Sequence, residues 1–362
     1  MAVYELTSPR PAPSNLRGPV KWIIDHLLSS PLNIALTLLG ISFLYLIIPP
    51  FIQWAIIDAN FVGETKADCT GDGACWIFIK QKFTLFIYGF YPESEYWRMN
   101  TAFGLFFVFG LFFKYVGQNF ISKLLVFSAY PIIAFYLISG GAFGLEHVAT
   151  DKWGGLSLTI IIASIGIVVA FPIGVVLAFG RQSKLPVIKN LSVMYIEFIR
   201  GVPLISILFM ASVLLPLFFP EGMDFNKLLR ALIGITMFQA AYIAEVIRGG
   251  LQSIPSGQYE AADAMGLSYW QKMLLVILPQ AIKVAIPNLI GASIALFKDT
   301  TLVLIIGLFD LLAVVHLAGS DATWMGFETE GYVFVTFIFW AFCFSLSKYG
   351  KFLENKFDTN NR

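Results

Sequence analysis

The sequence predicts an all-α integral membrane protein with about eight transmembrane helices. Of its 362 residues, 57% are hydrophobic and 13% are charged, and the charged share is about half that of a soluble domain. Most of the surface must therefore face an apolar medium. Eight apolar stretches approach the length of about 20 residues that a helix needs to cross a bilayer. Lys and Arg also gather on one side of the resulting topology, as the positive-inside rule expects.

The eight stretches lie along the whole chain, and the seventh is long and interrupted by Lys298 and Asp299. They are Leu32–Trp54, Met99–Val116, Ile121–Ser139, Leu156–Phe179, Pro203–Phe219, Leu228–Ile247, a segment from Ile282 to beyond Leu304, and Tyr332–Ser347. With the N-terminus inside, sixteen Lys and Arg fall on inside segments and seven on outside segments, while Lys298 lies within a span. This asymmetry predicts that both termini are cytoplasmic.

The chain changes character near residue 150. Residues 1–30 are polar, hold four prolines and lack the apolar core of a secretory signal, so we expect a cytoplasmic tail. Residues 31–150 are expected to form three spans with a periplasmic loop at 57–98. Cys69 and Cys75 lie in that loop, on the oxidising side, where they are either disulfide-bonded or two free thiols. From residue 154 to 350 the loops become rich in Gly, Pro, Glu and Arg, and 351–362 is expected to be a cytoplasmic tail.

A compact polar stretch, GQYEAADAMGLSYWQKMLLVILPQ (257–280), lies between two spans on the cytoplasmic side. Pro255 and Gly257 suit a helix start, and Glu260 is expected in the first turn, where a carboxylate meets unpaired amides. Gly266 suits the left-handed residue that ends a helix. Ser268 can cap a second helix, which Pro279 interrupts or bends. We expect a short helix across the cytoplasmic mouth, with a small-residue face that lets another body approach closely.

The spacing of this stretch resembles the signature loop of ABC importer permeases. That family has Glu-Ala-Ala, three residues, Gly, nine residues, Ile, one residue and Leu-Pro, and this chain departs only in having Val276 for Ile. The stretches YIEFIRGVPLI (195–205), AAYIAEVIRGGLQSIPSGQYEAA (240–262), LPQAIKVAIPN (278–288) and LFKDTTLV (296–303) are similar to the polar amino-acid branch. The resemblance covers about Leu156 to Lys348. The chain length and three extra N-terminal spans resemble the general L-amino acid permease subgroup.

The resemblance implies a permease subunit of an amino-acid importer, with a five-helix type I core at 154–350. It implies a homologous second permease, an ABC ATPase dimer that binds ATP and Mg, and a periplasmic amino-acid-binding protein. It places the chain in the bacterial inner membrane. The ATPase-coupling loop would comprise Gln258, Glu260, Ala261, Ala262, Asp263, Gly266, Leu278 and Pro279.

Two pairs of charges stand next to this loop. Glu197 and Arg200, and Glu245 and Arg248, are each three residues apart, so each pair can meet on one helix face. We interpret them either as braces that transmit loop motion to the spans, or as ordinary interfacial pairs with snorkelling arginines.

Lys298, Asp299 and Thr300 form the third candidate site. Charged residues at membrane depth are rare and usually face a cavity or a partner. An ammonium next to a carboxylate suits both ends of a zwitterionic amino acid, but it equally suits a structural pair. Adjacent helical residues point about 100° apart, so both reach one ligand only if the helix unwinds.

Other functions are disfavoured by missing motifs. A net charge of +1 offers no basic field for nucleic acid, and the three His fit no metal-binding pattern. The chain has no phosphate-binding Gly-x-x-x-x-Gly-Lys-Ser/Thr loop, so it is not expected to be an enzyme or to bind ATP itself. An intramembrane enzyme would need a nucleophile and base, which we do not find. A secondary transporter or channel without an ATPase remains the alternative, although no internal repeat is evident.

Overall fold

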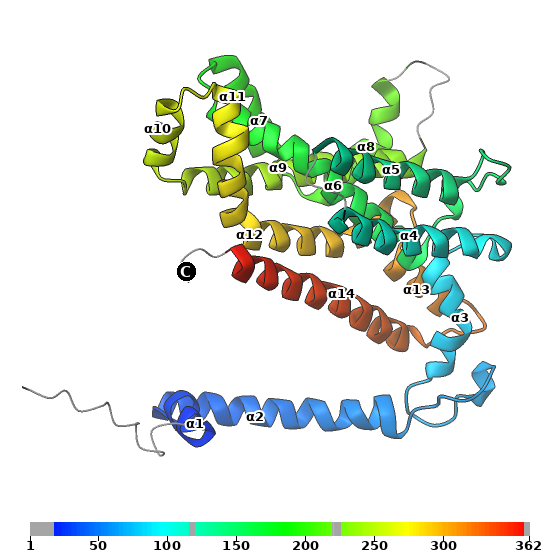
Figure 1. The fold of residues 1–362 in the computed structure, drawn as a ribbon. Coiled ribbons are helices and arrows are strands. Elements are labelled where there is room, and N and C mark those ends of the chain that lie inside the picture. Colours follow the sequence, from blue (N-terminus) through cyan, green and yellow to red (C-terminus); the bar gives the residue numbers. More distant parts are fainter. Residues whose placement is uncertain (1–17, 116–119, 219, 221–225, 358–362) are drawn as a thin grey trace, which may run out of the picture. The chain divides into compact units, whose positions relative to one another are not determined.

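The computed structural model describes residues 18–115, 120–218, 220 and 226–357, and every regular element among them is a helix or helical turn (Figure 1). Parts of the expected tails, 1–17 and 358–362, lie outside the described residues. The α-helices are α1 Pro19–Leu27, α2 Pro31–Ile52, α3 Trp76–Tyr88, α4 Tyr96–Tyr115, α5 Phe120–Ser139, α6 Gly155–Gln182, α7 Pro186–Gly201, α8 Leu204–Val213, α9 Lys227–Gln252, α10 Ser256–Ala264, α11 Tyr269–Gln271, α12 Leu278–Asp299, α13 Leu311–Gly319 and α14 Glu328–Phe357.

The chain forms two compact units, Met1–Ile77 and Phe78–Arg362. In the first unit, the Ser30 side chain caps α2 by accepting from the Asn33 amide at 3.1 Å. Pro49 and Pro50 lie near the other end of α2 and a π turn, Gln53–Ile57, follows. No residue of α2 is buried, and a helix that is apolar on all sides is typical of a membrane span.

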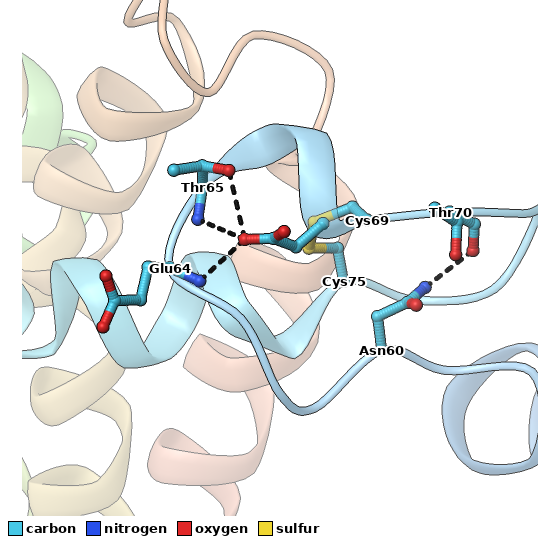
Figure 2. The surroundings of a disulfide bond; sticks show 7 residues. Asn60, Glu64, Thr65, Cys69, Thr70 and Cys75 are labelled. Atoms are coloured by element: carbon cyan, nitrogen blue, oxygen red, sulfur yellow. Dashed lines mark hydrogen bonds between the residues drawn. A yellow bond between two sulfur atoms is a disulfide. The ribbon is translucent and has the colours of Figure 1, made fainter.

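The loop after α2 is held by backbone pairing and by the disulfide between Cys69 and Cys75 (Figure 2). The structure thus contains the bonded form of the two alternatives that the sequence allowed. The Asp68 carboxylate accepts hydrogen bonds from the amides of Glu64 and Thr65, both at 2.9 Å. These bonds hold the pKa of Asp68 below its usual value. The carboxylate therefore stabilises the turn by accepting these two backbone hydrogen bonds.

The second unit includes α4 and α5 together with all later helices. The boundary between the units along the chain therefore follows residue 77 and does not coincide with the change in composition near residue 150. The reason is packing: Met99 of α4 and Ile138 of α5 share one buried cluster with Leu158 of α6. Arg98 is fully buried beside them. Its Nη2 donates to the Glu146 carbonyl at 2.6 Å, and its Nε lies 3.1 Å from the Glu95 carboxylate.

α6 and α9 form the most extensive helix pair of this unit and lie side by side (Figure 1). Glycines let their backbones approach. A Cβ on Gly174 of α6 would lie 2.6 Å from Ile243 and 3.0 Å from the Ala240 carbonyl oxygen, and a Cβ on Gly166 would lie 2.8 Å from Ile235. Small residues at such positions are the usual way for helices to pack closely in membranes.

Five helices in the described residues are long and apolar enough to cross a membrane, or six if one bent pair counts as a span. The five are Pro31–Ile57, Gly155–Gln182, Lys227–Gln252, Tyr269–Ile306 and Glu328–Phe357. The predicted stretches Met99–Val116 and Ile121–Ser139 fall on α4 and α5, which border residues outside the described part, so the count of eight stays a prediction.

The fifth predicted span differs from the structure in its start. The bent pair is α7 with α8, and the two helices meet at 105°. The sequence prediction began this span at Pro203 and so covers α8 alone. α7 joins it only if the bent pair is counted as one span, and Lys189, Glu197 and Arg200 make α7 amphipathic. The break falls at Val202, which is extended before Pro203, as the residue before a proline usually is.

Candidate functional site

The stretch 255–280 folds as its local signals predict. α10 begins at Ser256 after Pro255, and Gly266 follows its end with a φ of +72°, a conformation that favours glycine. Ser268 then caps α11 in a capping box with Gln271. A π turn, Lys272–Ile277, carries the chain into α12, where Pro279 stands at the start. Glu260 is the fifth residue of α10, so the prediction that it lies in the first turn was wrong.

α10 is fastened to the rest of the unit by three polar contacts and one buried side chain. Gln280 of α12 donates to the Gln258 side chain at 3.1 Å, and the Tyr259 hydroxyl donates to the Leu251 carbonyl of α9 at 3.3 Å. Lys272 lies 2.5 Å from the Asp263 carboxylate. Ala262 is buried, so the small residue at the middle of the motif faces this chain's own helices.

The opposite face of α10 is open. Glu260, Ala261 and Gly266 are exposed, and an added Cβ on Gly266 would meet nothing within 4 Å. Met265 is 80% exposed, which is unusual for so apolar a side chain at the end of a polar helix. α10 stands with α11 at one end of the second unit (Figure 1), so this face is free to contact another protein.

A cluster of charges joins α6, α7 and α9 near α10. Glu245 is paired with Arg248 as the spacing predicts, and Arg248 also donates to Gln252 at 2.6 Å. The predicted pairing of Glu197 with Arg200 was wrong. Glu197 binds Arg181 of α6 at 2.8 Å, and Arg200 lies 3.7 Å from Glu245. Arg181 is sixteen residues from Glu197, so no local spacing signal could identify it.

Lys298, Asp299 and Thr300 point in different directions, as adjacent residues of a helical segment must. Thr300 is fully buried and its hydroxyl donates to the Phe297 carbonyl at 2.8 Å. Lys298 is exposed and lines a groove of about 450 Å³ between α12, α13 and α14. The groove is otherwise formed by Thr301, Leu312, Val335, Thr336, Phe339, Trp340 and Cys343. The hydroxyls beside Lys298 in the groove are therefore those of Thr301 and Thr336, and not that of the predicted Thr300.

Within the described part of the chain, no three His, Cys, Asp or Glu side chains gather so that they could hold a metal ion.

Comparisons with known proteins agree with this geometry. Residues 170–359 match the family model described as binding-protein-dependent transport system inner membrane component. The chain is 51% identical over 355 residues to the inner membrane amino-acid ABC transporter permease protein YhdY of Escherichia coli, covering 97% of this chain and 96% of that protein. It is 38% identical to BztC of Rhodobacter capsulatus, a glutamate/glutamine/aspartate/asparagine transport system permease protein, over 99% of this chain and 98% of that one.

A solved structure extends the agreement to the fold. A crystal structure of an amino acid ABC transporter with histidines superimposes with a TM-score of 0.50 at 30% identity, over 56% of this chain and 92% of that chain. The C-terminal part therefore has the type I importer permease fold that the resemblance implied. By sequence, fold and motif, this chain is a member of the family of binding-protein-dependent transport system inner membrane components, the permease subunits of ABC transporters.

Proposed function

We propose that the chain is the permease subunit of an ATP-driven amino-acid importer in the bacterial inner membrane. It forms the translocation pathway with a second, homologous permease. A periplasmic amino-acid-binding protein delivers the substrate, and a pair of ABC ATPases binds ATP and Mg. Both termini of the chain are cytoplasmic. The amino-acid substrate is supported by the relatives, which are named as amino-acid permeases.

The observation that carries the coupling mechanism is the two-sided nature of α10. One side is bound to α9 through Tyr259, to α12 through Gln258, and to Lys272 of the π turn before α12 through Asp263. The other side is exposed and has open space around Gly266. A helix held in this way transmits a push from a docked ATPase to α9 and α12. The charged residues support the same transmission: Arg200 of α7 lies near Glu245 of α9, and Glu197 of α7 binds Arg181 of α6. Arg248 holds Glu245 within α9.

The substrate contacts are proposed to come from the end of α12. Lys298 offers an ammonium for the carboxylate of the amino acid. Asp299 can offer a carboxylate for the ammonium of the same molecule only when the end of α12 unwinds, because in the helical arrangement it points away from Lys298. Thr300 is buried, so in the described arrangement we assign it to holding the turn after α12 and not to touching the substrate.

The test uses the complete complex in proteoliposomes, with uptake of radiolabelled L-glutamine and L-glutamate and binding-protein-stimulated ATPase activity as readouts. Gly266→Val and Glu260→Lys are expected to abolish both, because they place bulk and the wrong charge on the docking face. Gly326→Val is the matched control, since Gly326 also has a left-handed φ, +102°, and open space around it. Glu354→Lys controls for reversing an exposed charge near the C-terminal end of α14.

Two results would overturn the proposal. If stimulated ATPase activity survives both variants, α10 is not the docking element. If no ATPase copurifies with the tagged wild-type chain and uptake follows an ion gradient, the chain is a secondary transporter.

A further inference from the structure

The charged cluster between α6, α7 and α9 has three guanidinium groups and two carboxylates. Arg181 comes from the last turn of α6, Glu197 and Arg200 from α7, and Glu245 and Arg248 from α9. Apart from Glu197, each of these side chains is 22–33% exposed. The three guanidiniums share two carboxylates, and Glu245 alone lies within 4 Å of all three arginines.

Arg181 connects the two carboxylates in the described conformation. Its Nη1 lies 2.8 Å from Glu197 Oε1 and 3.4 Å from Glu245 Oε2. The backbone beside it is also close to α7, because a Cβ on Gly180 would lie 2.2 Å from the Ser192 hydroxyl. Arg181 therefore fastens the end of α6 to both α7 and α9, the helix that leads into α10.

Arg200 is the arginine that is poorly paired. Its nearest carboxylate oxygen is Glu245 Oε2, at 3.7 Å, and its Nε is buried without a hydrogen-bond partner. Its guanidinium carbon stands 5.7 Å from the centre of the Tyr242 ring. Arg200 follows Glu197 by three residues on the same helix, a spacing at which opposite charges readily pair. Glu197 has the most exposed side chain of the cluster, at 54%, so it is the carboxylate with most freedom to turn.

We propose that Glu197 exchanges between two arginines during transport: Arg181 of α6, as described here, and Arg200 of its own helix. Arg181 is a positioning residue that joins α6 to the cluster in one conformation and releases it in the other. Glu197 keeps one arginine partner in either conformation and Glu245 keeps Arg248, so the two helix ends can separate without leaving a carboxylate unpaired. This inference rests on the proposed function, because the exchange matters only if the inner helix ends move.

The test measures the amount of radiolabelled L-glutamine transported per ATP hydrolysed by the complete complex in proteoliposomes. Arg181→Ala leaves Glu197 only Arg200, and Arg200→Ala leaves it only Arg181, so each variant holds the cluster in one state. Each is expected to lower the transport-to-hydrolysis ratio about tenfold, within the usual range of coupling energies between sites. The double variant is expected to be no worse than either single one, because both steps belong to one exchange.

Two further variants separate this role from a purely structural one. Arg181→Lys keeps a positive charge at the position that meets both carboxylates, so it should fold normally and restore most of the lost ratio. Lys184→Ala is the matched control. Lys184 lies just beyond α6, is exposed, and forms no ion pair within the described residues, so its loss should change nothing.

The outcomes distinguish this inference from the proposed function. If the wild-type complex shows no ATP-driven uptake of the labelled amino acids, the proposed function fails and the exchange fails with it. If the wild-type complex transports but Arg181→Ala transports equally well, only the exchange is wrong. If the two single losses multiply to about a hundredfold in the double variant, the arginines act independently, which also overturns the exchange.

Discussion

Gly249 and Gly250 are neighbours near the end of α9, and they meet different surroundings. A Cβ on Gly250 would lie 2.5 Å from the Ala281 carbonyl oxygen of α12 and 3.2 Å from Ala285 Cβ, whereas a Cβ on Gly249 would meet nothing within 4 Å. Alanine at position 250 must therefore push the α12 backbone away by about 0.9 Å to reach ordinary contact distance. A carbonyl oxygen cannot rotate out of the way as a side chain can.

The magnitude follows from comparing the two alanine variants. Both gain the same helix propensity, about 1 kcal/mol for Gly to Ala, so this gain cancels in the difference. What remains is the cost of overpacking at Gly250, about 1–3 kcal/mol. Since a large domain shifts its melting temperature by roughly 2–4 °C per kcal/mol, Gly250→Ala should melt at least about 2 °C below Gly249→Ala.

The assay is thermal unfolding of the purified chain in detergent micelles, followed by tryptophan fluorescence at one scan rate for both variants. Gly249→Ala should melt at or slightly above the wild type. The reasoning would be refuted if Gly250→Ala melted at the same temperature as Gly249→Ala, since α9 and α12 would then not touch backbone to backbone at this point.

Three other predictions test the charged and bonded groups. Burial raises the pKa of Asp310 to about 6. Between about pH 4 and 6 the folded chain therefore keeps a proton on this carboxyl that the unfolded chain has lost. The free energy of unfolding should fall by about 3 kcal/mol as the pH rises through that window. Asp310→Asn should remove this dependence and melt higher than the wild type at pH 7, where the wild-type chain keeps an ionised carboxylate in a buried position; a pH dependence that persists in the variant would contradict the raised pKa of Asp310. Arg98→Ala should lower the free energy of unfolding by about 3 kcal/mol or more, because its ion pair is buried. Lys82→Ala breaks a more exposed pair with Asp321 at 3.1 Å and should lower it by less than about 1 kcal/mol. Similar losses for the two variants in chemical denaturation would argue against the burial of Arg98. In a Cys343→Ala background, a membrane-impermeant maleimide should label intact cells only after reduction or after Cys75→Ser, which leaves the half-buried Cys69 thiol free. That loss of the disulfide should cost the loop about 2 kcal/mol, and labelling of the chain with both cysteines present, without reduction, would rule out the bond.

The parts of the site that sequence could predict are those set by neighbours along the chain. Gly266 ends α10 and Ser268 caps α11 because their roles depend on residues within one helical turn. The partner of Glu197 could not be predicted in this way. The spacing favoured Arg200, but folding brings Arg181 closer, and the choice depends on how α6 crosses α7 at Gly180.

The helix α7 shows the same limit. Its charged residues meet the ends of α6 and α9, so hydropathy does not select it, and its bent pairing with α8 is evident only from the structure. The compact unit beginning at Phe78 was also not evident, because the burial of Met99 and Ile138 against α6 depends on contacts between distant segments.

The glycine contacts between α6 and α9 restrict how the molecule can rearrange. With Gly174 against Ala240 and Ile243, the two helices have no layer of side chains to slide upon at this level, so they move together there. A hinge has to lie elsewhere, and the 105° corner between α7 and α8 is suited to it. The nitrogen of Pro203 carries no hydrogen, so α7 can change its angle to α8 without breaking a hydrogen bond from Pro203, while α8 stays packed against α9.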